Sequence, residues 1–417
     1  MSKGVDTVGL DSPPRLAVDR LLDDRQTRII VCCGAGGVGK TTTAAALGVR
    51  AAARGRKAVV LTIDPARRLA QSMGIDSLDN TPRRVADAGA DGGELHAMML
   101  DMKRTFDEIV EAHADAERAR AILANPFYQS LSAGFAGTQE YMAMEKLGQL
   151  RARDDWDLII VDTPPSRSAL DFLDAPKRLG SFLDGKFIRV LMAPAKVGGR
   201  AGMKFLNVGM SMMTGTLSKL MGASLLKDVQ TFVAAMDTMF GGFRTRADAT
   251  FRLLQAPGTA FLVVAAPEPD ALREAAYFVE RLAAERMPLA GLVLNRVHGS
   301  GADQLSAERA LAAAENLEEG GIVDQESGKA GLRDTAAEPP GADDDTTAVD
   351  RITAGLLRLH AERMQVIARE QRTRDRFTSL HPEVAVAEVT ALPGDVHDLA
   401  GLRAIGERLA AGVPAGA

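Results

Sequence analysis

The stretch Cys33-Gly34-Ala35-Gly36-Gly37-Val38-Gly39-Lys40-Thr41-Thr42 decides the fold of this chain. An apolar run, residues 28–32, precedes it and an alanine-rich segment, residues 42–53, follows it, so we expect a buried strand, a tight glycine turn and a helix. The spacing Gly34-x-x-x-x-Gly39-Lys40-Thr41 fits a P-loop. In such a loop, backbone N–H groups surround phosphates, Lys40 reaches the β and γ oxygens, and the Thr41 hydroxyl binds Mg²⁺.

The same glycines also fit the dinucleotide fingerprint Gly34-x-Gly36-x-x-Gly39, which is a weak pattern by itself. That pattern does not account for Lys40-Thr41 directly after the last glycine, whereas the P-loop does. We therefore predict a nucleoside triphosphate site. Its predicted binding residues are Gly34, Gly36, Gly37, Val38, Gly39, Lys40, Thr41 and Thr42.

Composition restricts the remaining classes of function. A net charge of −5 and the lack of a lysine-rich tail give no reason to expect nucleic-acid binding. The two cysteines, Cys32 and Cys33, are neighbours in the predicted first strand, so they should face opposite sides and remain reduced.

Residues 1–27 are polar and lack the apolar region of a signal peptide, and residues 205–218 are too short to cross a bilayer. We expect a soluble, cytoplasmic protein.

A second apolar run, residues 57–63, reads as a strand of a parallel sheet and ends at Asp64-Pro65-Ala66-Arg67-Arg68. The carboxyl ends of such strands face the ligand. Asp64 is therefore placed to orient or deprotonate a water that attacks the γ-phosphate. The alternative is that Asp64 caps the helix that follows.

The run Trp156-Asp157-Leu158-Ile159-Ile160-Val161-Asp162 is an apolar strand that ends in an aspartate, the Walker B form. The Asp162 carboxylate would support Mg²⁺ directly or through water. This pattern is common alone, but it gains weight from the P-loop upstream. The exposed loop that follows, residues 164–168, could sense the γ-phosphate.

Residues 185–240 are rich in methionine and predict at least two amphipathic helices. Eight of the 17 methionines lie there: Met192, Met203, Met210, Met212, Met213, Met221, Met236 and Met239. The helices either pack as ordinary core or form an adaptable groove for apolar helices, because thioethers repack easily. The sequence does not separate these two alternatives.

The remaining elements follow from apolar runs and turn residues. We expect one helix over residues 102–123, strands at 259–265 and 289–294, a helix at 351–374 and a last strand at 384–391. Asn295 either reads the edge of adenine through its amide or closes a turn. Residues 315–350 combine glycines, prolines and acidic residues and predict a solvated loop.

These elements predict an N-terminal extension (1–27) and a P-loop core in two parts (28–184 and 258–314). They also predict a Met-rich helical subdomain (185–257), a flexible acidic insertion (315–350), and a final helix, strand and helix of the core (351–411).

In this order, the motifs resemble those of the arsenical pump-driving and tail-anchored-protein-targeting ATPases, which are deviant Walker P-loop proteins. The resemblance covers most of residues 28–411. It implies an α/β P-loop NTPase fold with a mostly parallel, doubly wound sheet flanked by helices, and a helical subdomain insertion. It assigns Asp64 to switch I, Asp162 to switch II, and Asn295, Arg296 and Pro393 to the adenine. It also implies ATP and Mg²⁺ as cofactors and closure of a dimer driven by ATP.

Three departures from that family bear on function. Ala35 occupies the position of a signature lysine that reaches the partner's phosphates across the dimer, and Arg67 and Arg68 replace a histidine and an asparagine after switch I. No cysteine follows Cys33, so the zinc Cys-x-x-Cys of the targeting factors and the arsenite-binding cysteines of the pump ATPase are both missing. We expect no zinc-clamped dimer and no arsenite-specific role.

The sequence therefore predicts a Mg²⁺-dependent ATPase in which Asp64 and Lys40 act in catalysis and Thr41 and Asp162 hold the metal. It would form a homodimer, or preferably a heterodimer with a paralogue that carries the lysine. It would move a helical subdomain that engages a hydrophobic helix or a membrane protein, with peripheral membrane association left open. The alternative is an ATP-gated, weakly hydrolysing regulatory subunit. A partitioning ATPase is disfavoured, because no basic stripe or terminal membrane helix is present.

Overall fold

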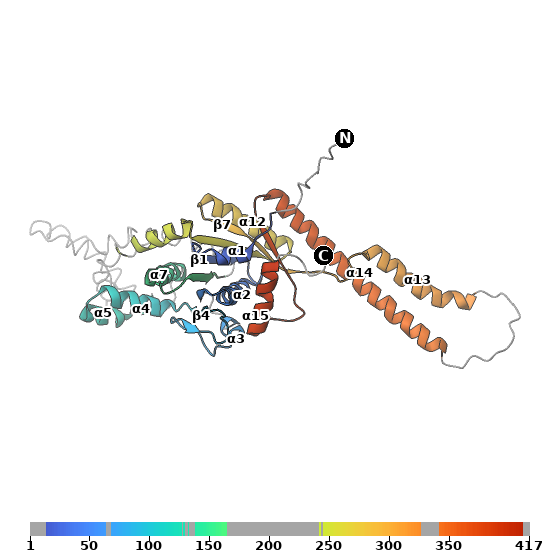
Figure 1. Cartoon of the computed structure of the whole chain (residues 1–417), viewed down its shortest axis with the longest axis horizontal. Helices are drawn as coiled ribbons and strands as arrows, with labels where there is room; N and C mark the ends of the chain where they lie inside the picture. The colour runs from blue at the N-terminus through green and yellow to red at the C-terminus, as the bar shows by residue number, and fades with distance from the viewer. Residues whose placement is uncertain are drawn as a thin grey trace, which may run out of the picture.

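The computed structural model describes residues 14–63, 68–126, 128–129, 132, 138–164, 242, 245–326 and 342–411. Within them lies an eight-stranded sheet of order β3-β4-β2-β5-β1-β6-β7-β8 (Figure 1). Every pairing except that of β3 with β4 is parallel, which confirms the predicted mostly parallel sheet. The strands are β1 Ile29–Gly34, β2 Lys57–Thr62, β3 Arg83–Arg84, β4 Glu94–Met99, β5 Leu158–Asp162, β6 Thr259–Ala265, β7 Leu289–Val297 and β8 Val386–Thr390.

Helices cover both faces of the sheet, as its two-sided apolar strands require. One face is covered by α1 (Val18–Asp23), α2 (Lys40–Ala53), α3 (Arg68–Ser72) and α15 (Leu399–Ala411). The other is covered by α4 (Met102–His113), α7 (Thr138–Arg153) and α12 (Pro269–Ala284). The predicted methionine-rich helices and the predicted Asp64 site lie outside the described residues.

The prediction of a single helix over residues 102–123 is wrong, because the chain forms two helices there, α4 and α5 (Ala116–Leu123). Ala114 adopts an extended conformation between them, and the Asp115 carboxylate accepts a hydrogen bond of 2.9 Å from the Arg118 backbone N–H. An aspartate that caps a new helix offers the backbone an alternative to continuing the old one. The apolar periodicity does not reveal this break.

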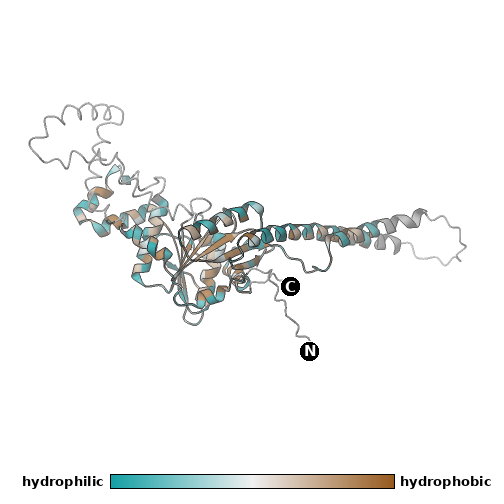
Figure 2. Cartoon of the chain, turned by 90° about the horizontal axis from the view of Figure 1, so that it is seen from above, coloured by the Kyte–Doolittle hydropathy of each residue, from teal (hydrophilic) through white to brown (hydrophobic). Residues whose placement is uncertain are grey.

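A helical hairpin, α13 (Ala307–Glu326) and α14 (Ala342–Leu380), projects away from the sheet in Figures 1 and 2. The two helices pack through alanines that are fully buried, Ala310 and Ala314 against Ala354 and Ala361. Helix therefore occupies both ends of the stretch 315–350, where the composition predicted a solvated loop. Small side chains let the two backbones approach closely, and this packing stabilises helices that polar composition alone would not predict.

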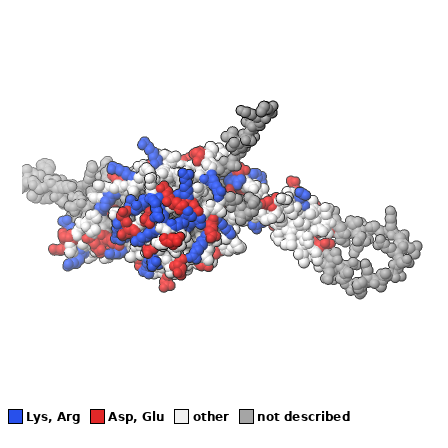
Figure 3. Space-filling model, in the orientation of Figure 1, with Lys and Arg blue, Asp and Glu red and all other residues white. Residues whose placement is uncertain are grey.

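Acidic and basic side chains are interspersed over the face of the core seen in Figure 3. Among the described residues, no helix combines the length and the apolar character needed to cross a membrane.

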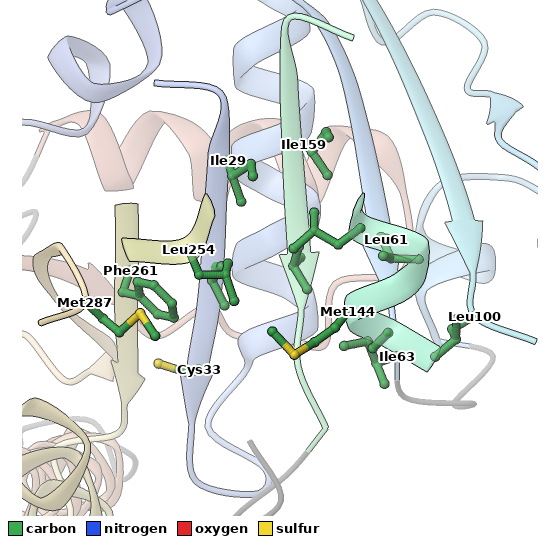
Figure 4. Close-up of a cluster of buried hydrophobic side chains, with 14 of the residues drawn as sticks. Ile29, Cys33, Leu61, Ile63, Leu100, Met144, Ile159, Leu254, Phe261 and Met287 are labelled. Atoms are coloured by element: carbon green, nitrogen blue, oxygen red, sulfur yellow. The ribbon is translucent and has the colours of Figure 1, made fainter. Parts of the chain in front are cut away.

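The core follows the alternation of the strands. Ile29, Val31 and Cys33 point into the cluster beneath α7 and α12, part of which Figure 4 shows, whereas Ile30 and Cys32 point into the cluster beneath α2. The two cysteines therefore face opposite sides of β1, as predicted, and both are free and buried. Burial raises the pKa of the Cys33 thiol to about 12, so it stays protonated.

One arginine holds the N-terminal segment to the sheet. Arg56 is buried, and its guanidinium donates to the carbonyls of Leu22 (2.9 Å), Asp24 (3.1 Å), Thr27 (2.7 Å) and Asp157 (2.5 Å). These carbonyls belong to α1, to the loop between α1 and β1, and to the residue before β5. Arg56 thus joins segments that are far apart in the sequence.

Replacing Arg56 should destabilise the fold without touching the candidate site. We expect Arg56→Met to lower the free energy of unfolding by about 3 kcal/mol, because several inward-facing carbonyls lose their donor. Urea unfolding followed by circular dichroism measures this. Arg25→Met removes an exposed arginine from the same region and should cost less than about 0.5 kcal/mol. Equal effects of the two variants would contradict this role of Arg56.

Candidate functional site

The P-loop follows the carboxyl end of β1. This strand lies near the middle of the sheet, between β5 and β6. Two of its glycines are required by close neighbours. A Cβ on Gly34 would lie 2.0 Å from the Val264 carbonyl oxygen, and one on Gly39 would lie 2.3 Å from the Asn295 amide nitrogen. Gly39 also has φ +94°, a left-handed conformation that favours glycine. The spacing in the sequence thus reflects contacts with β6 and β7.

Lys40 begins α2 and is nearly buried, with 6% of its surface exposed. Its ammonium donates a hydrogen bond of 2.6 Å to the carbonyl oxygen of Ala35, at the other end of the loop. The Ala35 side chain is itself buried in the apolar cluster beneath α2. The loop therefore holds a cation within the ring formed by its own backbone.

A cluster of oxygen atoms lies next to the P-loop. The Asp162 carboxylate is fully buried, and its Oδ2 accepts hydrogen bonds from Thr41 Oγ1 (2.7 Å) and Thr62 Oγ1 (2.9 Å). Hydroxyl and carboxylate oxygens are ligands that suit Mg²⁺, so the residues present fit this ion. The described residues contain no group of three or more His, Cys, Asp or Glu side chains that could hold a metal on its own.

Thr62 is a member of this cluster that the sequence did not single out. It ends β2, and its backbone lies opposite Asp162 in the parallel register of β2 with β5. That neighbourhood depends on the order of the strands, which no local motif encodes. The only indication of this role in the sequence is that Thr62 carries a hydroxyl near the end of a predicted strand.

A cavity of about 510 Å³ opens beside the start of α2. It brings together the predicted residues Gly39, Thr42, Asn295, Arg296 and Pro393. Its other lining residues are Thr43, His298, Thr390, Ala391, Leu392, Gly394, Asp395, Val396 and Ile405. Segments from α2, β7 and the loop after β8 therefore meet at one hollow next to the phosphate loop.

Asn295 makes a contact that the sequence did not predict. Its amide nitrogen donates a hydrogen bond of 2.8 Å to the carbonyl oxygen of Val38, which ties the end of β7 to the P-loop. Arg296 follows with φ +63°, at an irregularity in the pairing of β7 with β8. Arg296 is the additional residue of β7 at this irregularity, because Asn295 and Val297 pair with consecutive residues of β8. Arg296 therefore lines the cavity beside Asn295.

His298 is a second residue that the sequence missed. Its backbone N–H and its Nδ1 lie 2.9 Å and 2.6 Å from the two carboxylate oxygens of Glu370 on α14, and the residue lines the cavity. Glu370 is distant in sequence, so no spacing could reveal this pair. The switch I residues Asp64 and Arg67, together with Pro165, lie outside the described residues, and Arg68 is described only as the start of α3.

Gly39 offers a direct test of the loop geometry. We expect Gly39→Ala to weaken ATP binding about tenfold or more, because a Cβ there would displace the Asn295 amide and strain the loop by about 1.4 kcal/mol. Isothermal titration calorimetry measures the dissociation constant. Gly74→Ala is the matched control, because Gly74 has a similar φ of +67° but no neighbour within 4 Å of a Cβ. Equal affinities for ATP in the two variants would contradict the proposed contact.

Comparison with known proteins identifies the family. Residues 27–318 match the family model described as anion-transporting ATPase, which is more than half of the chain. The ATPase GET3 of Podospora anserina is 26% identical over 299 residues, which cover 70% of this chain and 80% of that protein. The ATPase GET3 of Malassezia globosa is 30% identical over 173 residues, which cover 42% of this chain and 49% of that protein.

A third relative, the putative arsenical pump-driving ATPase of Halobacterium salinarum, is 28% identical over 205 residues, covering 46% of this chain and 31% of that protein. The chain thus spans about half or less of two of these relatives and four fifths of the other. The family match agrees with the P-loop at the end of an inner parallel strand and with the resemblance of the motifs. The chain belongs to the anion-transporting ATPase family.

Proposed function

We propose that this chain binds Mg²⁺ and ATP and hydrolyses ATP at a dimer interface, and that the cycle moves a helical subdomain that engages a hydrophobic client or a membrane partner. The observation that carries the proposal is the cluster of Thr41, Thr62 and Asp162 beside the P-loop. The Lys40 ammonium lies within this loop, where it donates to the Ala35 carbonyl. Membership of an ATPase family supports it.

Thr41 and Asp162 would hold the metal. The Thr41 hydroxyl donates a hydrogen bond to Asp162, so its oxygen lone pairs can face a cation. Asp162 orients this hydroxyl and supplies the negative charge that the site needs. When bound, Mg²⁺ neutralises charge on the β- and γ-phosphate oxygens.

Lys40 would bind the phosphates. Its ammonium now donates to the Ala35 carbonyl, and a triphosphate in the loop would offer it charged oxygens in place of that neutral acceptor. Asp64 would orient or deprotonate the attacking water. Both Lys40 and Asp64 belong to this chain, so neither role requires a side chain from a partner.

Asn295 would select adenine. Because its amide nitrogen donates to Val38, its amide oxygen can accept from the exocyclic amine of adenine. Guanine carries a carbonyl at that position and would place one acceptor against another. Arg296 and Pro393 would line the same base site.

Ala35 supports a heterodimer. A cation supplied across a dimer is typically worth about 10³–10⁵ in rate, and this chain offers an alanine where the family resemblance implies that lysine. In a pair with a lysine-bearing paralogue, the nucleotide of this chain would receive the partner's lysine, and the partner's nucleotide would lack one. The same alanine favours the alternative role, a weakly hydrolysing regulatory subunit.

Removing the metal ligand tests the hydrolytic role. Asp162→Asn should lower kcat for ATP hydrolysis by about 100-fold or more and raise the Mg²⁺ concentration that is needed, because the Thr41 hydroxyl loses its anionic acceptor and the metal loses negative charge beside it. Steady-state turnover over a Mg²⁺ titration measures both. Asp303→Asn, at an exposed loop position, should behave like the wild type. Unchanged turnover in Asp162→Asn would contradict the assignment.

Partners can be captured with a trapped enzyme. Asp64→Asn should bind ATP without hydrolysing it, so purification from the native host should retain a lysine-bearing paralogue and a protein with an apolar segment. Lys40→Ala, which loses its phosphate contact, should retain neither. Recovery of the paralogue alone would overturn client handling and favour the regulatory role. Recovery of the client without the paralogue would overturn the heterodimer.

A further inference from the structure

An exposed apolar stripe runs along the part of α14 that projects from the core. The described residues include six large apolar side chains that are strongly exposed, and four of them lie on this helix between residues 349 and 359. They are Val349 (60% exposed), Ile352 (65%), Leu356 (61%) and Leu359 (62%). Their spacing of three, four and three residues is that of the a and d positions of a coiled coil, so they share one face of the helix.

One row of this face is covered where α14 runs along the core. Arg363, Glu370 and Phe377 continue the row of Leu356 at intervals of seven residues. Arg363 donates to the Gly299 carbonyl (2.7 Å), Glu370 accepts from His298, and Phe377 is buried in the core. The row of Leu356 therefore contacts the domain over its last part, whereas the four apolar side chains on the hairpin are exposed.

The companion helix α13 does not cover the stripe. It packs on Ala354 and Ala361, which are fully buried and lie on the side of α14 opposite the a and d positions. The stripe thus faces away from α13, on a hairpin that projects from the sheet in both views (Figures 1 and 2). The surface of the hairpin seen in Figure 3 carries few charged side chains.

Gly355 is a second, independent observation at this surface. It lies inside a helix of 39 residues, where glycine is unfavourable, and a Cβ built on it meets nothing within 4 Å. No contact within the described chain therefore requires a glycine. Gly355 lies at the edge of the stripe, next to Leu356, where a missing side chain lets another helix approach closely.

We propose that this stripe, Val349, Ile352, Leu356 and Leu359, is a self-docking surface that pairs antiparallel with the same stripe of a second copy of this chain. A two-fold axis near residue 354 would place Val349 against Leu359 of the other copy and Ile352 against Leu356. Every apolar side chain then meets an apolar side chain, with a d position facing each a position.

The residues beside the stripe favour a second copy over a differently charged partner. The flanking positions nearest the axis are Ala348, Thr353, Gly355 and His360, so none of them is an aspartate, glutamate, lysine or arginine. Coiled coils that select a different partner usually place like charges at these flanks to oppose self-pairing. Four side chains per copy make a contact smaller than the roughly 1,200 Å² of a stable interface, so the pairing should depend on concentration.

Sedimentation velocity of the full chain without nucleotide tests self-docking separately from the ATPase cycle. The wild type should associate as its concentration rises, and the double variant Ile352→Lys, Leu356→Lys should remain monomeric over the same range. Leu380→Lys, an exposed leucine about 30 Å further along the same helix, should associate like the wild type. A monomeric wild type, or a double variant that still associates, would overturn the proposal. Loss of ATP hydrolysis would leave both results unchanged.

Cysteine cross-linking tests the antiparallel arrangement. The native cysteines are buried, so a Gly355→Cys chain treated with a mild thiol oxidant should form a disulfide only between the new thiols of two copies. Arg351→Cys, exposed on a side of α14 that faces away from the stripe, should not cross-link. Circular dichroism and thermal unfolding check that both variants fold. Cross-linking through Leu356→Cys but not Gly355→Cys would show parallel pairing and overturn the proposed arrangement.

Discussion

The parallel hydrogen bonds that pair β5 with β1 on one side and with β2 on the other bring three distant chain segments to one edge of the sheet. The register fixes Thr62 opposite Asp162, and the loop after β1 delivers Thr41 to the same carboxylate. Because the strands are buried on both faces, a shift of one residue would move each side chain into the opposite apolar cluster, where it would not fit the packing. The oxygen cluster thus inherits its geometry from the packing of the core.

A second set of contacts joins the cavity beside α2 to the hairpin. The end of β7 supplies Arg296 to the cavity and the loop after it supplies His298, and α14 holds that loop through Glu370 and Arg363. Arg374 binds Glu388 on β8 at 2.8 Å, so the helix also contacts the strand that leads to Pro393. The helix that bears the exposed stripe is therefore attached to two of the segments that line this cavity.

The positions of small residues mark where separate elements approach one another. Gly34 and Gly39 admit the Val264 carbonyl and the Asn295 amide, and Ala354 and Ala361 let α13 and α14 pack closely. Ala35 is different, since its side chain is buried in the core while its carbonyl accepts from Lys40. Its side chain offers no cation at the position where the family resemblance implies a lysine that reaches the partner's phosphates.

The sequence by itself determined the parallel α/β core, the P-loop, and the aspartate at the end of β5, because buried parallel strands are continuous apolar runs and phosphate loops have a fixed local spacing. It also predicted that Asn295 and Pro393 lie near the nucleotide, although by family resemblance. Only the tertiary structure decided that Thr62 joins Asp162, that the Asn295 amide binds Val38, and that Glu370 holds His298. It likewise decided that α13 and α14 form a hairpin with one bare face. These features depend on strand order and on contacts between residues far apart in the chain, and no local pattern of residues encodes them.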